Sequence, residues 1–145
     1  MRKSITENLS PCCEEVLETM FFTGILSAEV QTVCRGAGDL HASVRFEGPP
    51  DGELRVWIPM QTGSALASSF LGLAPGEVTS ADCEQVAGEL ANMFCGSLLS
   101  RSAPTSEFHL TVNQEQAPDA EPCDSCVAFE LPEGPLNVCV RVDRL

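Results

Sequence analysis

Hydrophobic residues recur at two different periods along the chain, and these periods separate helical from extended segments. The first helical segment lies near the N-terminus. Ser10 suits the residue before a helix, Pro11 suits the first helical position, and Glu14 and Glu15 complement the positive end of the helix dipole. The sequence therefore predicts a helix that is capped by Ser10, starts at Pro11 and reaches about Thr23.

Alternation of core-type apolar residues at every second position marks the extended segments. It runs over residues 40–46 and 54–58, and the turn-forming residues 48–52 (Gly-Pro-Pro-Asp-Gly) lie between them. These features predict a β-hairpin, with a shorter strand over residues 29–34 before it. Later period-2 segments predict three more strands, over residues 108–112, 126–131 and 136–142.

Two further helices are expected between the hairpin and the last three strands. Residues 63–72 favour a short helix that the Pro75-Gly76 pair ends, and Thr79 or Ser80 is a good cap for a long helix that follows. The predicted fold is α+β, a largely antiparallel β-sheet with two long helices and a short helix packed on it.

The long helix is expected to have two different faces. At 100° per residue, one stripe consists of Gln85, Glu89, Asn92 and Gly96, and a second consists of Val86, Leu90, Met93, Phe94 and Ser97. The second stripe suits a core, so the first would be presented outward. Gly96 has no side chain, so another molecule's backbone could approach there. The alternative is a solvated face without function, which polar stripes often are.

The run Gly88-Glu89-Leu90-Ala91-Asn92-Met93, followed by Gly96, resembles the signature helix of the CheX/CheC family of chemotaxis phosphatases. Members of this family hydrolyse the aspartyl phosphate of CheY-like response regulators. The resemblance implies that Glu89 anchors a lysine of the phosphorylated regulator. It also implies that Asn92 orients the attacking water, that Mg²⁺ belongs to the partner, and that the chain needs no cofactor or metal of its own.

The two long helices hint at an internal duplication. Residues 16–21 can be laid on residues 89–94 so that Leu, Met and Phe coincide, while Val16 takes the place of Glu89 and Thr19 that of Asn92. The repeat halves would be residues 10–73 and 79–143, with one active site per chain. This is similar to the CheX branch, which implies a homodimer, and an open sheet edge could make the pairing. Chance similarity between two amphipathic helices is the alternative.

Composition limits the classes of partner. A chain of 145 residues suggests a single domain, residues 1–145, and its formal net charge of −13 opposes binding to nucleic acid or to an anionic membrane. No apolar run of membrane-spanning length and no signal peptide are evident, so we expect a cytoplasmic protein.

Eight cysteines are expected to be mostly reduced in such a compartment, with Cys34, Cys83, Cys95 and Cys139 in apolar surroundings. The Cys123-Asp-Ser-Cys126 motif is read as a turn between strands. The alternatives are a redox pair, or a metal site that Cys12 and Cys13 complete. The two histidines, His41 and His109, are expected to be structural or exposed.

Residues 113–125 are polar and contain two prolines, which predicts a long exposed loop. Two functions other than a phosphatase stay open at this point. One is a non-catalytic dimeric scaffold or binding module in a chemotaxis or flagellar assembly. The other is a thiol or metal sensor that uses Cys123 and Cys126.

Overall fold

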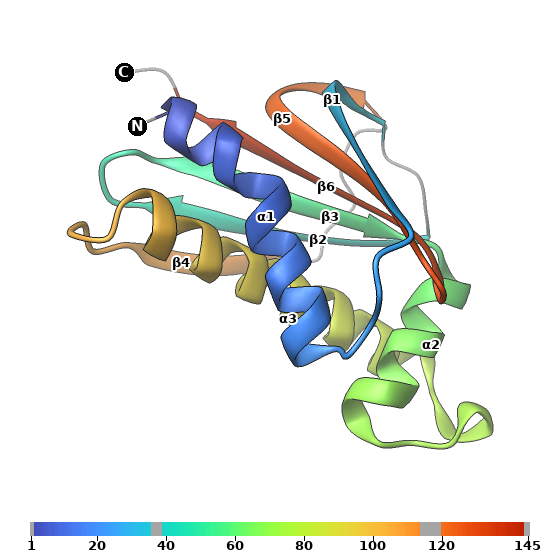
Figure 1. Ribbon diagram of the computed structural model, residues 1–145. Helices are drawn as coiled ribbons and strands as arrows, with labels where there is room; N and C mark the ends of the chain where they lie inside the picture. Colours follow the sequence, from blue (N-terminus) through green and yellow to red (C-terminus); the bar gives the residue numbers. More distant parts are fainter. Residues whose placement is uncertain (1, 36–38, 114–119, 144–145) are drawn as a thin grey trace.

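The computed structural model describes residues 2–35, 39–113 and 120–143. Its centre is one antiparallel sheet of six strands, in the spatial order β1-β5-β6-β3-β2-β4 (Figure 1). The strands in chain order are β1 (Ser27–Arg35), β2 (Leu40–Glu47), β3 (Gly52–Ile58), β4 (His109–Asn113), β5 (Ala120–Leu131) and β6 (Gly134–Val142). The predicted α+β fold with a largely antiparallel sheet is confirmed.

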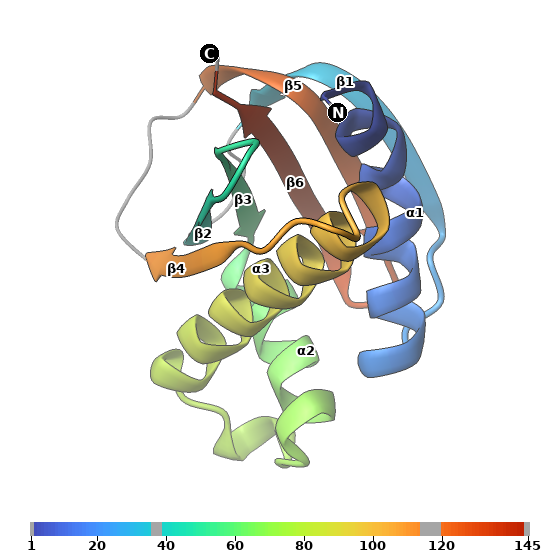
Figure 2. The same ribbon diagram turned by 90° about the vertical axis from the view of Figure 1, so that its left-hand side faces the viewer.

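Two long helices cover one face of this sheet, as Figure 2 shows. They are α1 (Arg2–Met20) and α3 (Ser80–Ser102), and they pack side by side; α1 contacts β5 and β6, whereas α3 contacts β2 and β3. The shorter α2 (Met60–Leu71) and the single turn η1 (Pro75–Glu77) connect β3 to α3 at one end of the sheet. The main hydrophobic core therefore lies between one sheet face and the two long helices.

The predicted hairpin is present as β2 and β3, in which Val44 pairs with Leu54 and Ala42 with Val56. These four side chains are fully buried beneath the helices. The alternate residues of both strands, Trp57 among them, point to the opposite face, because successive side chains alternate across a strand. There Trp57 packs with Cys126 and Cys139 in a small second cluster.

The N-terminal helix starts much earlier than predicted. It begins at Arg2, so Pro11 lies inside it, and it ends at Met20 rather than Thr23. The reason is a continuous buried stripe along its whole length: Ile5, Leu9, Cys12, Cys13, Val16 and Leu17. Because this stripe packs against the core, its burial outweighs the hydrogen bond that proline cannot donate.

The interpretation of residues 113–125 as one exposed loop is wrong in its second half. Strand β5 begins at Ala120, so the Cys123–Cys126 motif lies within a strand and not in a turn. Pairing with β1 supplies the backbone partners, and the register shifts between Gln31 and Val33, close to the residue that pairs with Pro122. An irregular ladder can accommodate a proline that a regular one excludes. Residues 114–119 lie outside the described part of the chain.

The sheet order places β1 and β4 at the two edges and β3 and β6 at the centre. Each edge strand thus has one side without a strand partner among the described residues, so the expected dimer has two candidate edges. The internal duplication and the dimer both stay predictions. No helix in the described part of the chain is both long enough and apolar enough to cross a bilayer.

Replacing Pro11 with alanine tests whether the first turns of α1 are helical in solution. Alanine restores a backbone donor inside the helix, so we expect the free energy of unfolding to rise by about 1–3 kcal/mol in urea denaturation. Pro75→Ala is the control, because Pro75 occupies the first position of η1, where proline is suited. A Pro11→Ala protein no more stable than wild type would contradict a continuous α1.

Candidate functional site

The candidate site lies on α3, which is held at both ends. At its start, the Thr79 Oγ1 atom accepts a hydrogen bond from the Asp82 backbone N–H (3.2 Å). The Asp82 carboxylate in turn accepts from the Thr79 N–H (2.9 Å). In its last turn, Arg101 forms an ion pair with Glu15 of α1 (2.6 Å). Of the two predicted caps, Thr79 and Ser80, Thr79 is the N-cap, and the helix has fixed contacts before and after the signature residues.

The buried face of α3 sets the rotation of the helix about its axis. Val86, Leu90 and Phe94 are fully buried, as predicted for the core stripe, whereas Met93 and Ser97 are only half-buried. The wider buried face comprises Cys83, Val86, Ala87, Gly88, Leu90, Ala91, Phe94, Cys95, Leu98 and Leu99. It meets α1, α2 and the sheet, so the remaining side of α3 must face outward.

That outward side carries the predicted residues. Gln85 and Asn92 are exposed, and Glu89 and Gly96 are half-buried. Side chains three residues apart on a helix have Cβ atoms about 5–6 Å apart, so Glu89 and Asn92 are neighbours. Within the described residues, neither side chain is engaged in a hydrogen bond or an ion pair. The acid and the amide are therefore available to another molecule.

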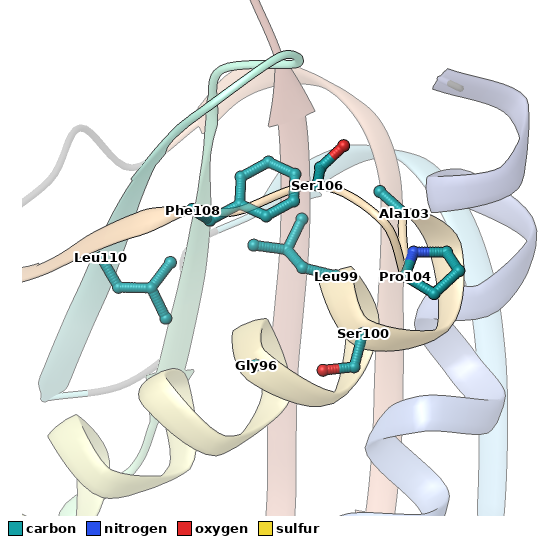
Figure 3. A pocket seen from close by; sticks show the side chains of 8 residues that line it. All are labelled: Gly96, Leu99, Ser100, Ala103, Pro104, Ser106, Phe108 and Leu110. Atoms are coloured by element: carbon teal, nitrogen blue, oxygen red, sulfur yellow. The ribbon is translucent and has the colours of Figure 1, made fainter.

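Gly96 opens this face toward a groove at the C-terminal half of α3 (Figure 3). A cavity of about 250 Å³ starts there, lined by Gly96, Leu99, Ser100, Ala103, Pro104, Ser106, Phe108 and Leu110. We call it the α3–β4 groove. In Figure 3, Phe108 and Leu110 extend from the segment that leads into β4 and from β4 itself, above the helix. A Cβ atom built on Gly96 meets nothing within 4 Å beyond the adjacent residues and backbone of its own helix, so the groove is open at this end.

Sequence reasoning identified Gly96 but missed the groove. The sequence does carry a signal, because Gly96 and Ser100 are small residues four apart and hence adjacent on one face. What it could not supply is the position of β4, whose pairing with β2 brings Phe108 and Leu110 over the helix. That contact joins residues far apart in sequence.

The cysteines are divided between two places. Cys12, Cys13, Cys83 and Cys95 are buried free thiols in the main core, and the Cys12 thiol donates to the Ser97 carbonyl (3.7 Å). Cys123 and Cys126 instead pack near Trp57 on the opposite sheet face. The structure thus does not bring the two pairs together into a metal site, and the described residues hold no cluster of three or more metal-ligating side chains. The Cys34 side chain lies outside the described residues.

The two histidines lie on strands β2 and β4 and not on α3. His41 is half-buried on the opposite face, where its ring contacts Trp57 (5.2 Å between ring centroids). His109 is exposed at the start of β4. Neither histidine belongs to the helix that carries Glu89 and Asn92.

One family model matches the sequence over more than half of its length. Residues 40–118 match this model, which is described as chemotaxis phosphatase CheX. No curated protein matches the sequence. The matched segment includes all of α3 and therefore both Glu89 and Asn92.

Solved structures share the fold over nearly the whole chain. A chemotaxis protein CheX from Desulfovibrio desulfuricans is 19% identical, with a TM-score of 0.70, over 96% of this chain and 99% of that one. CheX from Vibrio vulnificus is 16% identical, with a TM-score of 0.73, over 99% of each chain. A chain of the CheX–CheY–BeF₃–Mg²⁺ complex from Borrelia burgdorferi is 13% identical, with a TM-score of 0.69, over 95% and 97%.

The thiols of the core give a testable property of α3. Burial raises the pKa of the Cys95 thiol to about 12, and it raises the pKa of Cys13 well above its ordinary value. Because the thiolate is the reactive form, we expect neither residue to be alkylated by iodoacetamide at pH 8 in the folded protein. Peptide mass spectrometry after a short reaction measures this, with protein unfolded in guanidinium as the control. Rapid labelling of Cys95 in the folded state would show that α3 is not packed as described.

Proposed function

The chain belongs to the CheX family of chemotaxis phosphatases, and from this premise we propose that it hydrolyses the aspartyl phosphate of a CheY-like response regulator through Asn92 and Glu89. The observation that carries the proposal is the outward side of α3. An amide and an acid lie there as neighbours, unengaged by other described residues, on a helix fixed at both ends.

The reaction needs little covalent chemistry from this chain. A water molecule attacks the phosphorus atom in line with the bond to the aspartyl oxygen; that bond breaks, the aspartate leaves as a carboxylate, and inorganic phosphate is released. Catalysis of phosphoryl transfer rests mainly on positioning and on charge stabilisation. The regulator supplies the phosphoryl group and its Mg²⁺, so the phosphatase must supply the oriented water.

Asn92 suits that task. Its Oδ1 atom can accept a hydrogen bond from the attacking water while its amide group donates to a neighbouring oxygen. The carboxamide is neutral, so it adds no negative charge beside the phosphoryl group. Its exposure lets it enter a concave site on another protein.

Glu89 suits a different task, because a carboxylate directly at the phosphoryl group would be repelled. One turn away it can bind a lysine of the regulator through a charge-assisted hydrogen bond. Its half-buried position restricts its motion and so favours one orientation for that contact. A CheX chain with this fold was crystallised with CheY, BeF₃ and Mg²⁺ in the Borrelia burgdorferi complex, which supports a partner of this kind.

The alternative function is a non-catalytic binding module with the same core. Such a module could present the same helix, but it would not accelerate loss of phosphate from a regulator. The measurement of phosphate release below therefore separates the two functions.

Asn92→Ala should abolish the acceleration of dephosphorylation, with a loss of at least about 100-fold, since an unpositioned water removes the main source of catalysis. The free energy of unfolding should change by less than about 0.5 kcal/mol, because the residue is exposed. Phosphate release from acetyl-phosphate-treated CheY-like regulators measures the activity. Thr19→Ala is the matched control, because Thr19 is exposed at the position of α1 that the proposed duplication aligns with Asn92. Full activity in Asn92→Ala would refute its role.

Glu89→Gln should mainly weaken binding, raising KM for the phosphorylated regulator about tenfold or more while kcat changes less, because the ion pair with the lysine is lost. The effect should shrink at high salt, where screening weakens the wild-type contact. Glu18→Gln removes the same charge from an exposed site on α1 and should leave KM unchanged. Equal KM values for wild type and Glu89→Gln would contradict the anchoring role.

A further inference from the structure

We infer that the α3–β4 groove is a second contact site for the regulator, and that it receives an uncharged, apolar side chain from a loop flanking the phosphorylation site. This inference rests on the proposed function, since it concerns the same partner. It extends that function from the two reacting residues to a site that selects among regulators. Four features of the groove support it.

The first feature is its position. Gly96 follows Asn92 by four residues, about 6 Å along the helix axis, and Ser100 follows by about 12 Å. A specific protein interface buries about 800 Å² on each partner, which corresponds to a disc about 16 Å in radius. A regulator that brings its phosphoryl group to Asn92 must therefore cover much of the groove.

The second feature is its chemistry. The chain has a net charge of −13, yet none of the eight lining residues is charged. Leu99 lies buried beneath the groove, and the partly exposed Phe108 and Leu110 form an apolar wall. Ser100 and Ser106 contribute polar but neutral groups to the lining. Partly exposed apolar side chains gain by contact with an apolar group of a partner. A cationic or phosphorylated group would find no counter-charge among the lining residues.

The third feature is its size. The volume of about 250 Å³ lies below the range of about 300–1,000 Å³ that is usual for small-molecule pockets. It suits one large side chain rather than a nucleotide or a cofactor. Among possible occupants, a side chain of the protein that already covers the groove is therefore the one that its size and position favour.

The fourth feature is Gly96. Alanine would fit there without contact, and it would favour the helix by about 1 kcal/mol, so packing within this chain gives no reason for a glycine. Close approach of a partner's backbone gives one, because a methyl group would stand between the partner and the helix.

Charge along α3 also orients the regulator. Its N-terminal half carries three acidic residues, Asp82, Glu84 and Glu89, whereas the groove at the C-terminal half is uncharged. The cationic side of the regulator's phosphorylation site should therefore lie over the N-terminal half, with the apolar loop over the groove.

Ser100→Trp fills the groove and tests the inference. Ser100 is exposed, lines the groove, and is not one of the two residues proposed to act in the reaction, Glu89 and Asn92. The probes are purified CheY-like receivers activated with beryllium fluoride for binding, and phosphorylated with acetyl phosphate for hydrolysis. We expect Kd and KM to rise about tenfold or more while kcat stays within about twofold. Ser69→Trp is the matched control, because it places the same bulk on an exposed site of α2 and should change neither constant.

Gly96→Ala provides a second variant, for which the open space at Gly96 and the higher helix propensity of alanine predict a fold at least as stable as wild type. It should unfold at a higher temperature than wild type and still bind the activated receiver several-fold more weakly. Wild-type hydrolysis with unchanged Kd and KM in both groove variants would overturn the groove and leave the proposed function intact. Binding that both groove variants weaken, without hydrolysis by wild type, would support the groove and refute the phosphatase. Absence of binding by wild type would overturn both.

Discussion

The packing of one face of α3 against α1 and the sheet determines what the molecule presents to a partner. Leu90, Phe94 and Leu98 are fully buried there, and each such side chain contributes roughly 1.5–3 kcal/mol by leaving water. Rotating the helix would expose them and lose an amount comparable with the whole stability of a small domain. The direction of Asn92 is therefore fixed by residues that never touch a partner.

Stability and recognition are divided between the two sides of the same helix. The buried side, the Thr79 cap and the Arg101–Glu15 ion pair hold α3 in place. The outward side contains a glycine and an asparagine, both poor helix formers, and the described residues make no polar contact with its acid and amide. The low helix propensity of these two residues thus conflicts with the helical fold at the place where a partner is proposed to dock. Such conflicts are expected at functional sites.

Much of this arrangement could be predicted from periodicity, because the α3 stripes and the β2–β3 hairpin depend on local patterns. The predictions that failed depend on distant partners. Pro11 is typical of a helix start. The turns that precede it are helical because they pack against the core. The Cys123–Cys126 motif reads as a turn, and only pairing with β1 and β6 makes it a strand.

The candidate site follows the same rule. Glu89 and Asn92 share one helix, so their adjacency could be deduced from spacing alone. The groove beside them needs β4, and no local signal specifies that β4 pairs with β2 and extends the sheet over the end of α3. Residues that a single helix brings together can be predicted from the sequence, whereas residues that two separate elements bring together cannot.

The burial of Val16 has a consequence for how such proteins evolve. Only 7% of Val16 is exposed, and in the proposed repeat register it occupies the place of Glu89. A carboxylate at that position would lose its hydration against the core and find no compensating partner there. Introducing an acid–amide pair on α1 at this position would thus require simultaneous repacking of the neighbours of Val16, so no single substitution there gives a second centre.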